Sequence, residues 1–264
     1  MEPMQFLDLT RFFFTLAILS YGAVSDFKKR EVANELWMIG LPAGLFLTAL
    51  RLALKFEVGT LLIFATSALC SFLLGLVLFY LGFAGGADAK ALFFLGLSLP
   101  LYPEEAFKPL SPVLPIFPLT VFNNAILLSL CVPGMIALRN LSQALKGCKV
   151  LGEVKAGTLG KLFLLFSSYR VSIADLRKKR YLNPAEKPLK DECVIVRKPI
   201  YFMPAENDRE KLIEEIEIYA SKGFYDDGIL ASPTLPMVLF LALGLVLGIF
   251  GDLALFIALR IVAP

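Results

Sequence analysis

The chain has 264 residues, of which 57% are hydrophobic and only 19% are charged, and its formal net charge is +3. Soluble domains carry about 25% charged residues, so this composition is typical of a polytopic membrane protein. The sequence contains no histidine, which excludes Ser–His triads, Cys–His dyads and HExxH zinc sites together. Paired carboxylates remain as the obvious catalytic groups.

Six apolar windows are long enough to span a membrane, which takes roughly 17 residues or more. The sequence therefore predicts an all-α polytopic membrane protein with six transmembrane helices, the fourth of them short. The first window lacks the basic segment that precedes the apolar core of a cleavable signal peptide, so we expect it to be retained. The windows lie at 5–26, 36–54, 58–83, 86–102, 117–138 and 235–258.

The polar stretch 139–231 separates the last two windows, and we expect it to form a small cytoplasmic α+β insertion. Apolar spacing predicts helices in it at 156–168 and 207–222, and short strands at 193–197 and 200–203. The expected domains are 1–138 with five transmembrane helices, 139–231 as the insertion and 232–264 with the sixth helix.

Basic residues indicate the orientation of the chain in the membrane. The loop 27–35 carries Lys28, Lys29 and Arg30, and the segment 139–230 holds 17 of the 26 Lys and Arg residues. By the positive-inside rule, both regions are predicted to be cytoplasmic and both termini to lie outside. This asymmetry accounts for the net charge of +3, so no nucleic-acid partner is expected.

Two aspartates lie at the ends of apolar runs. Asp26 closes the first window, and Asp88 follows Gly85-Gly86-Ala87 at the start of the fourth. A carboxylate within a membrane helix costs roughly 2.5–3.5 kcal/mol, which makes it a candidate functional group. Leu7 and Asp26 are 19 residues apart, about 28 Å of helix, so both acids are expected at the cytoplasmic edge. Two carboxyls that share a proton can act as general base and general acid.

Small residues one helical turn before each acid would let the two helices approach closely. A third acid, Asp252, lies about 27 Å along the last window, so we expect it near the outer face with a packing role. The small residues are Gly22 and Ala23 before Asp26, and Ala84 and Gly85 before Asp88.

The stretch from Asp26 to Val32-Ala33-Asn34, together with Gly85-Gly86-Ala87-Asp88-Ala89-Lys90, resembles the motifs of GxGD aspartic membrane proteases. The resemblance is strongest to the archaeal type IV prepilin and preflagellin (archaellin) peptidases. It implies that Asp26 and Asp88 are catalytic. No cofactor or metal is expected. The supporting motif residues would be Gly85, Gly86, Ala87 and Lys90.

The same resemblance implies removal of a short basic class III leader peptide from a prepilin or archaellin precursor at the cytoplasmic face. Ala87 stands where the family pattern has its second glycine, which adds a methyl group at a turn expected to be crowded. The CxxC pairs of many bacterial relatives are absent, so no N-methyltransferase activity is expected. Glu31 and Glu35, in the loop after Asp26, are candidates to bind the basic leader.

Two other functions remain open from the sequence. A presenilin-like intramembrane protease would also use two aspartates, but this chain lacks a Pro-Ala-Leu element near its last window. A proton-coupled transporter would also bury acids, but usually at the midplane of repeated halves rather than at one edge. Metal binding by Asp26 and Asp88 is disfavoured, because two carboxylates without His or Cys make a poor transition-metal site.

Overall fold

The computed structural model describes residues 2–29, 31–191, 194–201 and 206–262. Contacts within the chain divide it into two compact units. One comprises Met1–Ser129 with Pro236–Pro264, and the other is Leu130–Leu235.

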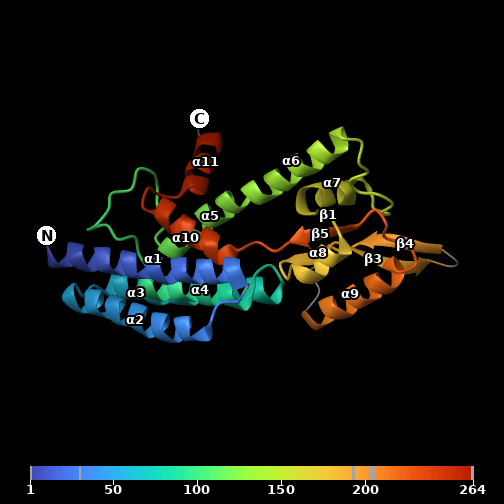
Figure 1. Ribbon diagram of the computed structural model, residues 1–264. Helices are drawn as coiled ribbons and strands as arrows, with labels where there is room; N and C mark the ends of the chain where they lie inside the picture. Colours follow the sequence, from blue (N-terminus) through green and yellow to red (C-terminus); the bar gives the residue numbers. More distant parts are fainter. Residues whose placement is uncertain (1, 30, 192–193, 202–205, 263–264) are drawn as a thin grey trace. The chain divides into compact units, whose positions relative to one another are not determined.

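The first unit is a bundle of helices in which segments far apart in sequence pack side by side. Helix α1 packs on α10 and α2, α3 packs on α4, and α5 packs on α10 (Figure 1). The last helices of the chain therefore share a core with the first. The helices are α1 (Pro3–Lys29), α2 (Asn34–Leu54), α3 (Val58–Tyr80), α4 (Gly86–Ser98), α5 (Phe117–Ser129), α10 (Met237–Gly248) and α11 (Leu253–Val262).

Helix length and apolar composition confirm a multi-pass membrane protein. In the described part of the chain, four helices are long and apolar enough to cross a membrane, or five if the bent pair α10–α11 is one span. Helix α4 has 13 residues, about 20 Å at 1.5 Å per residue, against a hydrocarbon thickness of about 30 Å. The four are α1, α2, α3 and the run Phe117–Leu145, which joins α5 to α6 (Cys131–Leu145).

The last apolar window, 235–258, was predicted to form one helix but contains two, α10 and the start of α11. Helices α10 and α11 meet at an angle of 66°. Gly251 lies between them with φ +124°, a conformation that favours glycine. The carboxylate of Asp252 then accepts a hydrogen bond from the Leu255 N–H at 2.9 Å. This capping contact starts a new helix in a new direction.

The proline-rich stretch between α4 and α5 has no regular helix or strand over 99–116, so the fourth helix ends at Ser98 rather than at 102, the end of its apolar window. It is fixed to the bend of the last two helices. The Tyr102 hydroxyl donates to the Ile249 carbonyl at 2.6 Å, and the N–H groups of Leu110 and Ser111 donate to the Phe250 carbonyl. The loop thereby satisfies the Ile249 and Phe250 carbonyls at the bend.

The second unit contains the predicted α+β insertion. Strands β1, β5 and β2 form an antiparallel sheet in that order, and β3 and β4 form an antiparallel hairpin. Leu176, Ile216 and Ile229 are fully buried in its main core. After α6, its elements are α7 (Thr158–Ser167), β1 (Tyr169–Val171), α8 (Ile173–Lys178), β2 (Leu182–Pro184), β3 (Glu186–Asp191), β4 (Val194–Pro199), α9 (Glu206–Ala220) and β5 (Ile229–Pro233).

The two helices predicted in the insertion are confirmed as α7 and α9. The strand predicted at 193–197 corresponds to β4, although Cys193 lies outside the described residues. Ile200 and Tyr201 belong to no strand, so the strand predicted at 200–203 is wrong at those positions, and 202–203 lie outside the described residues.

Candidate active site

Asp88 lies in the first turn of α4, where its side chain is held by backbone N–H groups. The Gly85 N–H donates to Asp88 Oδ2 at 2.7 Å, and the Val238 N–H, in the first turn of α10, also donates to this carboxylate. Asp88 is only 9% exposed. Two helix N-termini therefore converge on one buried carboxylate, and each favours negative charge there.

Asp26 is half-buried near the end of α1. It lies close enough to Asp88 for the two carboxyl groups to interact electrostatically. The chain places 61 residues between them, including two complete helices, α2 and α3. The fold thus brings together the two acids that the sequence singled out.

Small residues in the helical turn before Asp26 allow α1 to pack closely against its neighbours. Gly22 and Ala23 are both buried. A Cβ atom added to Gly22 would lie 3.3 Å from both Leu36 Cδ2 and Val238 Cγ1. Gly22, one helical turn before Asp26, therefore packs against Val238, the residue whose N–H donates to Asp88.

The glycines of the Gly85–Asp88 motif are less crowded than the sequence suggested. A Cβ on Gly86 would meet only Phe79 Cε2, at 3.9 Å, and one on Gly85 would meet only Asp88 Oδ2, at 3.4 Å. The tight contact is made by Gly75 in α3, where a Cβ would lie 2.9 Å from the Ala89 carbonyl oxygen. Gly75 could not be singled out from the sequence, because its only signal there was its place in an apolar helix.

Lys90 joins the two sequence motifs. Its Nζ donates to Asn34 Oδ1 at 2.6 Å, and Asn34 is the first residue of α2. Lys90 follows Asp88 by two positions, so on a helix its side chain projects about 200° away from that of Asp88. The contact therefore connects α4 to the start of α2, rather than adding a charge to the carboxyl pair.

Glu31 and Glu35 are exposed around the α1–α2 connection. The Ser25 hydroxyl donates to the Glu31 carbonyl at 2.9 Å, which closes the turn just after Asp26. Glu31 therefore lies in this connection, whereas Glu35 lies in the first turn of α2, so the prediction that both are in the loop is wrong for Glu35.

Asp252 is fully buried and makes structural contacts. Besides capping α11, it accepts a hydrogen bond from Asn123 Nδ2 at 2.8 Å, and its own N–H donates to the Pro112 carbonyl. From Val238 to Gly248, α10 extends about 15 Å, and Asp252 follows beyond its end. Its surroundings are those of a helix cap.

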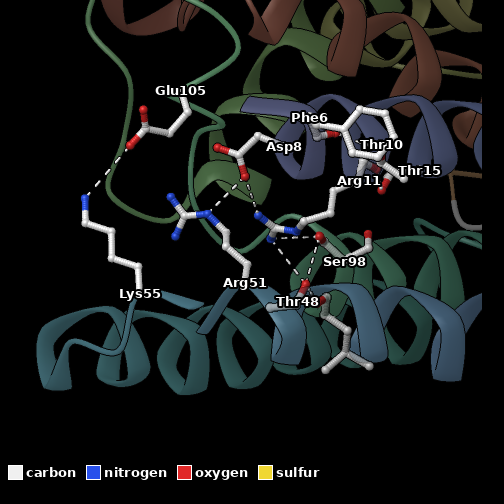
Figure 2. Close-up of polar contacts among 11 residues, drawn as sticks. Phe6, Asp8, Thr10, Arg11, Thr15, Thr48, Arg51, Lys55, Ser98 and Glu105 are labelled. Atoms are coloured by element: carbon white, nitrogen blue, oxygen red, sulfur yellow. Dashed lines mark hydrogen bonds and ion pairs between the residues drawn. The ribbon is translucent and has the colours of Figure 1, made fainter. Parts of the chain in front are cut away.

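A buried ion network at the opposite end of α1 was not predicted from the sequence. Asp8 Oδ1 binds Arg11 Nη1 at 3.1 Å and Arg51 Nε at 3.0 Å (Figure 2). Arg11 Nη2 also donates to Thr48 Oγ1 and to the Ser98 carbonyl. This network connects α1, α2 and α4. Its one sequence signal was the i, i+3 spacing of an acid and a base.

A cavity of about 430 Å³ lies beside this network. It is lined by Arg51 and Lys55 at the end of α2 and by Tyr102, Pro109 and Leu114 of the proline-rich stretch. None of its lining residues belongs to the Asp26–Asp88 site. Among the described residues, no three Cys, Asp or Glu side chains are grouped closely enough to hold a metal ion.

Two family models match the chain. Residues 13–133 match the type IV leader peptidase family, and residues 160–253 match the archaeal peptidase A24 C-terminus, type II. The first match covers Asp26, Asp88 and the motif residues around them.

Three curated relatives carry the name preflagellin peptidase. The protein of Methanococcus voltae is 31% identical over 50% of this chain and 58% of its own length. That of Methanocaldococcus jannaschii is 27% identical over 62% of this chain and 68% of its own length. That of Methanococcus maripaludis is 25% identical over 89% of this chain and 92% of its own length.

The matches and the multi-pass helical fold define the class of protein as a membrane-embedded protease, a hydrolase. Within that class, the chain is similar to the type IV leader peptidase family over residues 13–133, and its similarity to the archaeal preflagellin peptidases confirms the resemblance seen in the motifs.

Proposed function

We propose that this chain is an aspartic endopeptidase that removes a short basic leader peptide from preflagellin (archaellin) or prepilin precursors. Asp26 and Asp88 are its catalytic pair, one acting as general base on a water molecule and the other as general acid. The relatives named preflagellin peptidase support the substrate class. The proposed mechanism is supported above all by the electrostatic interaction between these two carboxyls, which lie 62 positions apart in sequence.

The surroundings of Asp88 suit this chemistry. Backbone N–H groups of Gly85 and Val238 hold its carboxyl group in one orientation, so a bound water between the two acids would meet a fixed partner. Like charges at short range disfavour double ionisation, and the pair would therefore hold one shared proton. Asp88 also caps α4, but capping does not account for a second acid beside it.

The membrane arrangement belongs to the same proposal. Six spans, with α4 as a short fourth and α10–α11 as a broken sixth, would place both termini outside and Asp26 and Asp88 at the cytoplasmic edge. The basic residues Lys28 and Lys29 after Asp26 support this orientation through the positive-inside rule. A leader peptide would then be cut as it emerges from the cytoplasmic side of its hydrophobic helix.

The experiment is cleavage of a purified preflagellin by the detergent-solubilised protein, with the products identified by mass. We expect one cut at the junction of the basic leader and the hydrophobic helix, and no loss of activity in EDTA. The rate should show a bell-shaped pH profile, because one carboxyl must be ionised and the other protonated. Cuts within the hydrophobic helix would indicate a presenilin-like protease instead. No cleavage, or activity abolished by chelator and restored by a divalent ion, would contradict the proposal.

A further inference from the structure

Helix α7 carries an apolar stripe that faces away from the core of its unit. Leu159, Leu162, Phe163 and Phe166 are all exposed, Leu159 to 83%. Their spacing of i, i+3, i+4 and i+7 places them on one side of the helix. Leu164, on the other side, is fully buried in a small core with Leu230. The exposed stripe is therefore a second, separate apolar face.

The stripe continues onto a neighbouring aromatic residue. Tyr201 lies against α7, and its ring packs edge-on against that of Phe163 with centroids 5.7 Å apart. Tyr201 is itself about half exposed. A tyrosine with an apolar ring and a polar hydroxyl is typical of the boundary between hydrocarbon and water.

Helix α7 is attached to a helix that belongs to a candidate membrane span. Asn140 in α6 donates from Nδ2 to the carbonyls of Leu165 and Ser168, at 2.8 and 2.7 Å. Helix α6 is the second part of the apolar run Phe117–Leu145. It exposes further leucines at 138, 141 and 145, on both sides of Asn140 along the chain. The end of α7 therefore lies at a level where α6 still presents an apolar surface.

Charge around α7 fits the headgroup region of a bilayer. The exposed side chains of the α6–α7 connection and of α7 itself include four lysines and one glutamate. Each cation near an anionic membrane surface contributes favourably to binding. The lysines are Lys146, Lys149, Lys155 and Lys161, and the glutamate is Glu153.

We propose that α7 is an interfacial helix that buries Leu159, Leu162, Phe163 and Phe166 in the lipid bilayer that the chain itself spans. Amphipathic helices of this kind lie in the membrane plane with the apolar side in the acyl boundary. The helix would thereby hold the insertion at the membrane surface. The proposal does not depend on the proposed peptidase activity.

Quenching of tryptophan fluorescence by brominated lipid tests whether the α7 stripe lies in the bilayer. The chain suits this experiment because Trp37 is its only tryptophan. Phe163→Trp is made in a Trp37→Phe background and placed in nanodiscs of phosphatidylcholine and phosphatidylglycerol, with or without acyl-brominated phosphatidylcholine. The matched control is Ile218→Trp on α9, where Ile218 is also exposed, to 57%. We expect bromolipid to remove much of the fluorescence of the Phe163→Trp variant and little of that of the Ile218→Trp variant.

Equal, weak quenching in the two variants would overturn the proposal. So would blue-shifted but unquenched fluorescence in the Phe163→Trp variant, which would show that protein, such as a second copy of the chain, covers the stripe. If Trp37→Phe impairs folding, Trp37 is kept in both variants. Its fluorescence is then the same in the two, and the difference between them still reports on position 163 or 218. Leu159→Trp provides a second position at the most exposed part of the stripe.

Discussion

The buried carboxyl group of Glu186 should make the insertion less stable as the pH rises. Glu186 is fully buried. Its Oε1 accepts the Leu230 N–H at 2.8 Å, while its Oε2 has no hydrogen-bond partner among the described residues. Burial raises the pKa of Glu186 from 4.5 to about 7, even though Arg197 and Arg170 nearby favour its charged form. The folded state therefore binds this proton more tightly than the unfolded state does.

The magnitude follows from proton linkage. A pKa raised in the folded state gives stability that is fully present below the unfolded pKa of 4.5 and is lost as the pH rises towards 7. At about 1.4 kcal/mol per pKa unit, this contribution amounts to roughly 3 kcal/mol. Glu186→Gln keeps an acceptor for the Leu230 N–H but cannot ionise. Relative to the unmodified protein, the variant should gain about 3 kcal/mol between pH 4.5 and pH 7 or above.

The assay is hydrogen–deuterium exchange of β5 in the full-length protein in detergent, corrected for the pH dependence of intrinsic exchange. Opening free energies of the variant and the unmodified protein are compared at several pH values. Glu214→Gln, an exposed site on α9, is the control and should follow the unmodified protein. Identical pH dependence in Glu186→Gln and the unmodified protein would refute the reasoning.

Three further predictions concern the membrane unit and the substrate. Asp8→Asn leaves two buried arginines without their carboxylate, so thermal unfolding in detergent should show a loss of about 3–5 kcal/mol; an unchanged melting temperature would contradict this. Lys90→Met should lower kcat roughly tenfold, equivalent to about 1.4 kcal/mol. The double variant Lys90→Met with Asn34→Leu should have the same kcat as Lys90→Met alone. Lys90→Arg, which keeps a donor, should restore most of the rate, and additive losses would show that the Lys90–Asn34 contact is not the cause. Glu31→Gln and Glu35→Gln should raise KM for a basic leader and leave kcat nearly unchanged, because charges at a rim act through steering and weak pairing. No change of KM in either variant would exclude this loop from leader recognition.

The sequence predicted best those features that depend on local composition. Long apolar windows gave α1, α2 and α3 to within a few residues, because a membrane helix needs only length and hydrophobicity. The polarity of residues 139–231 was sufficient to predict the insertion, and the apolar spacing within α9 was sufficient to predict that helix. The carboxylate pair could be inferred because an acid at the edge of an apolar run is costly and therefore informative.

Other features depended on contacts that local patterns do not record. The bend between α10 and α11 results from Gly251 together with hydrogen bonds to a loop about 140 residues earlier. The donation from Val238 to Asp88 comes from a helix that returns after the whole insertion. The strands β1 and β2 have three residues each, too few to show a period of two.

The central claim is that Asp26 and Asp88 act as one catalytic unit. The most direct measurement is the single-turnover cleavage rate of a preflagellin by Asp26→Asn, Asp88→Asn and the double variant, with Asp252→Asn as a buried control. Each single catalytic variant should lose a hundredfold or more, in line with general acid–base catalysis. The double variant should be no slower than the worse single one, because residues that act together lose their function together, and a folded Asp252→Asn should retain activity. Full activity in Asp88→Asn, or losses that multiply in the double variant, would contradict the account.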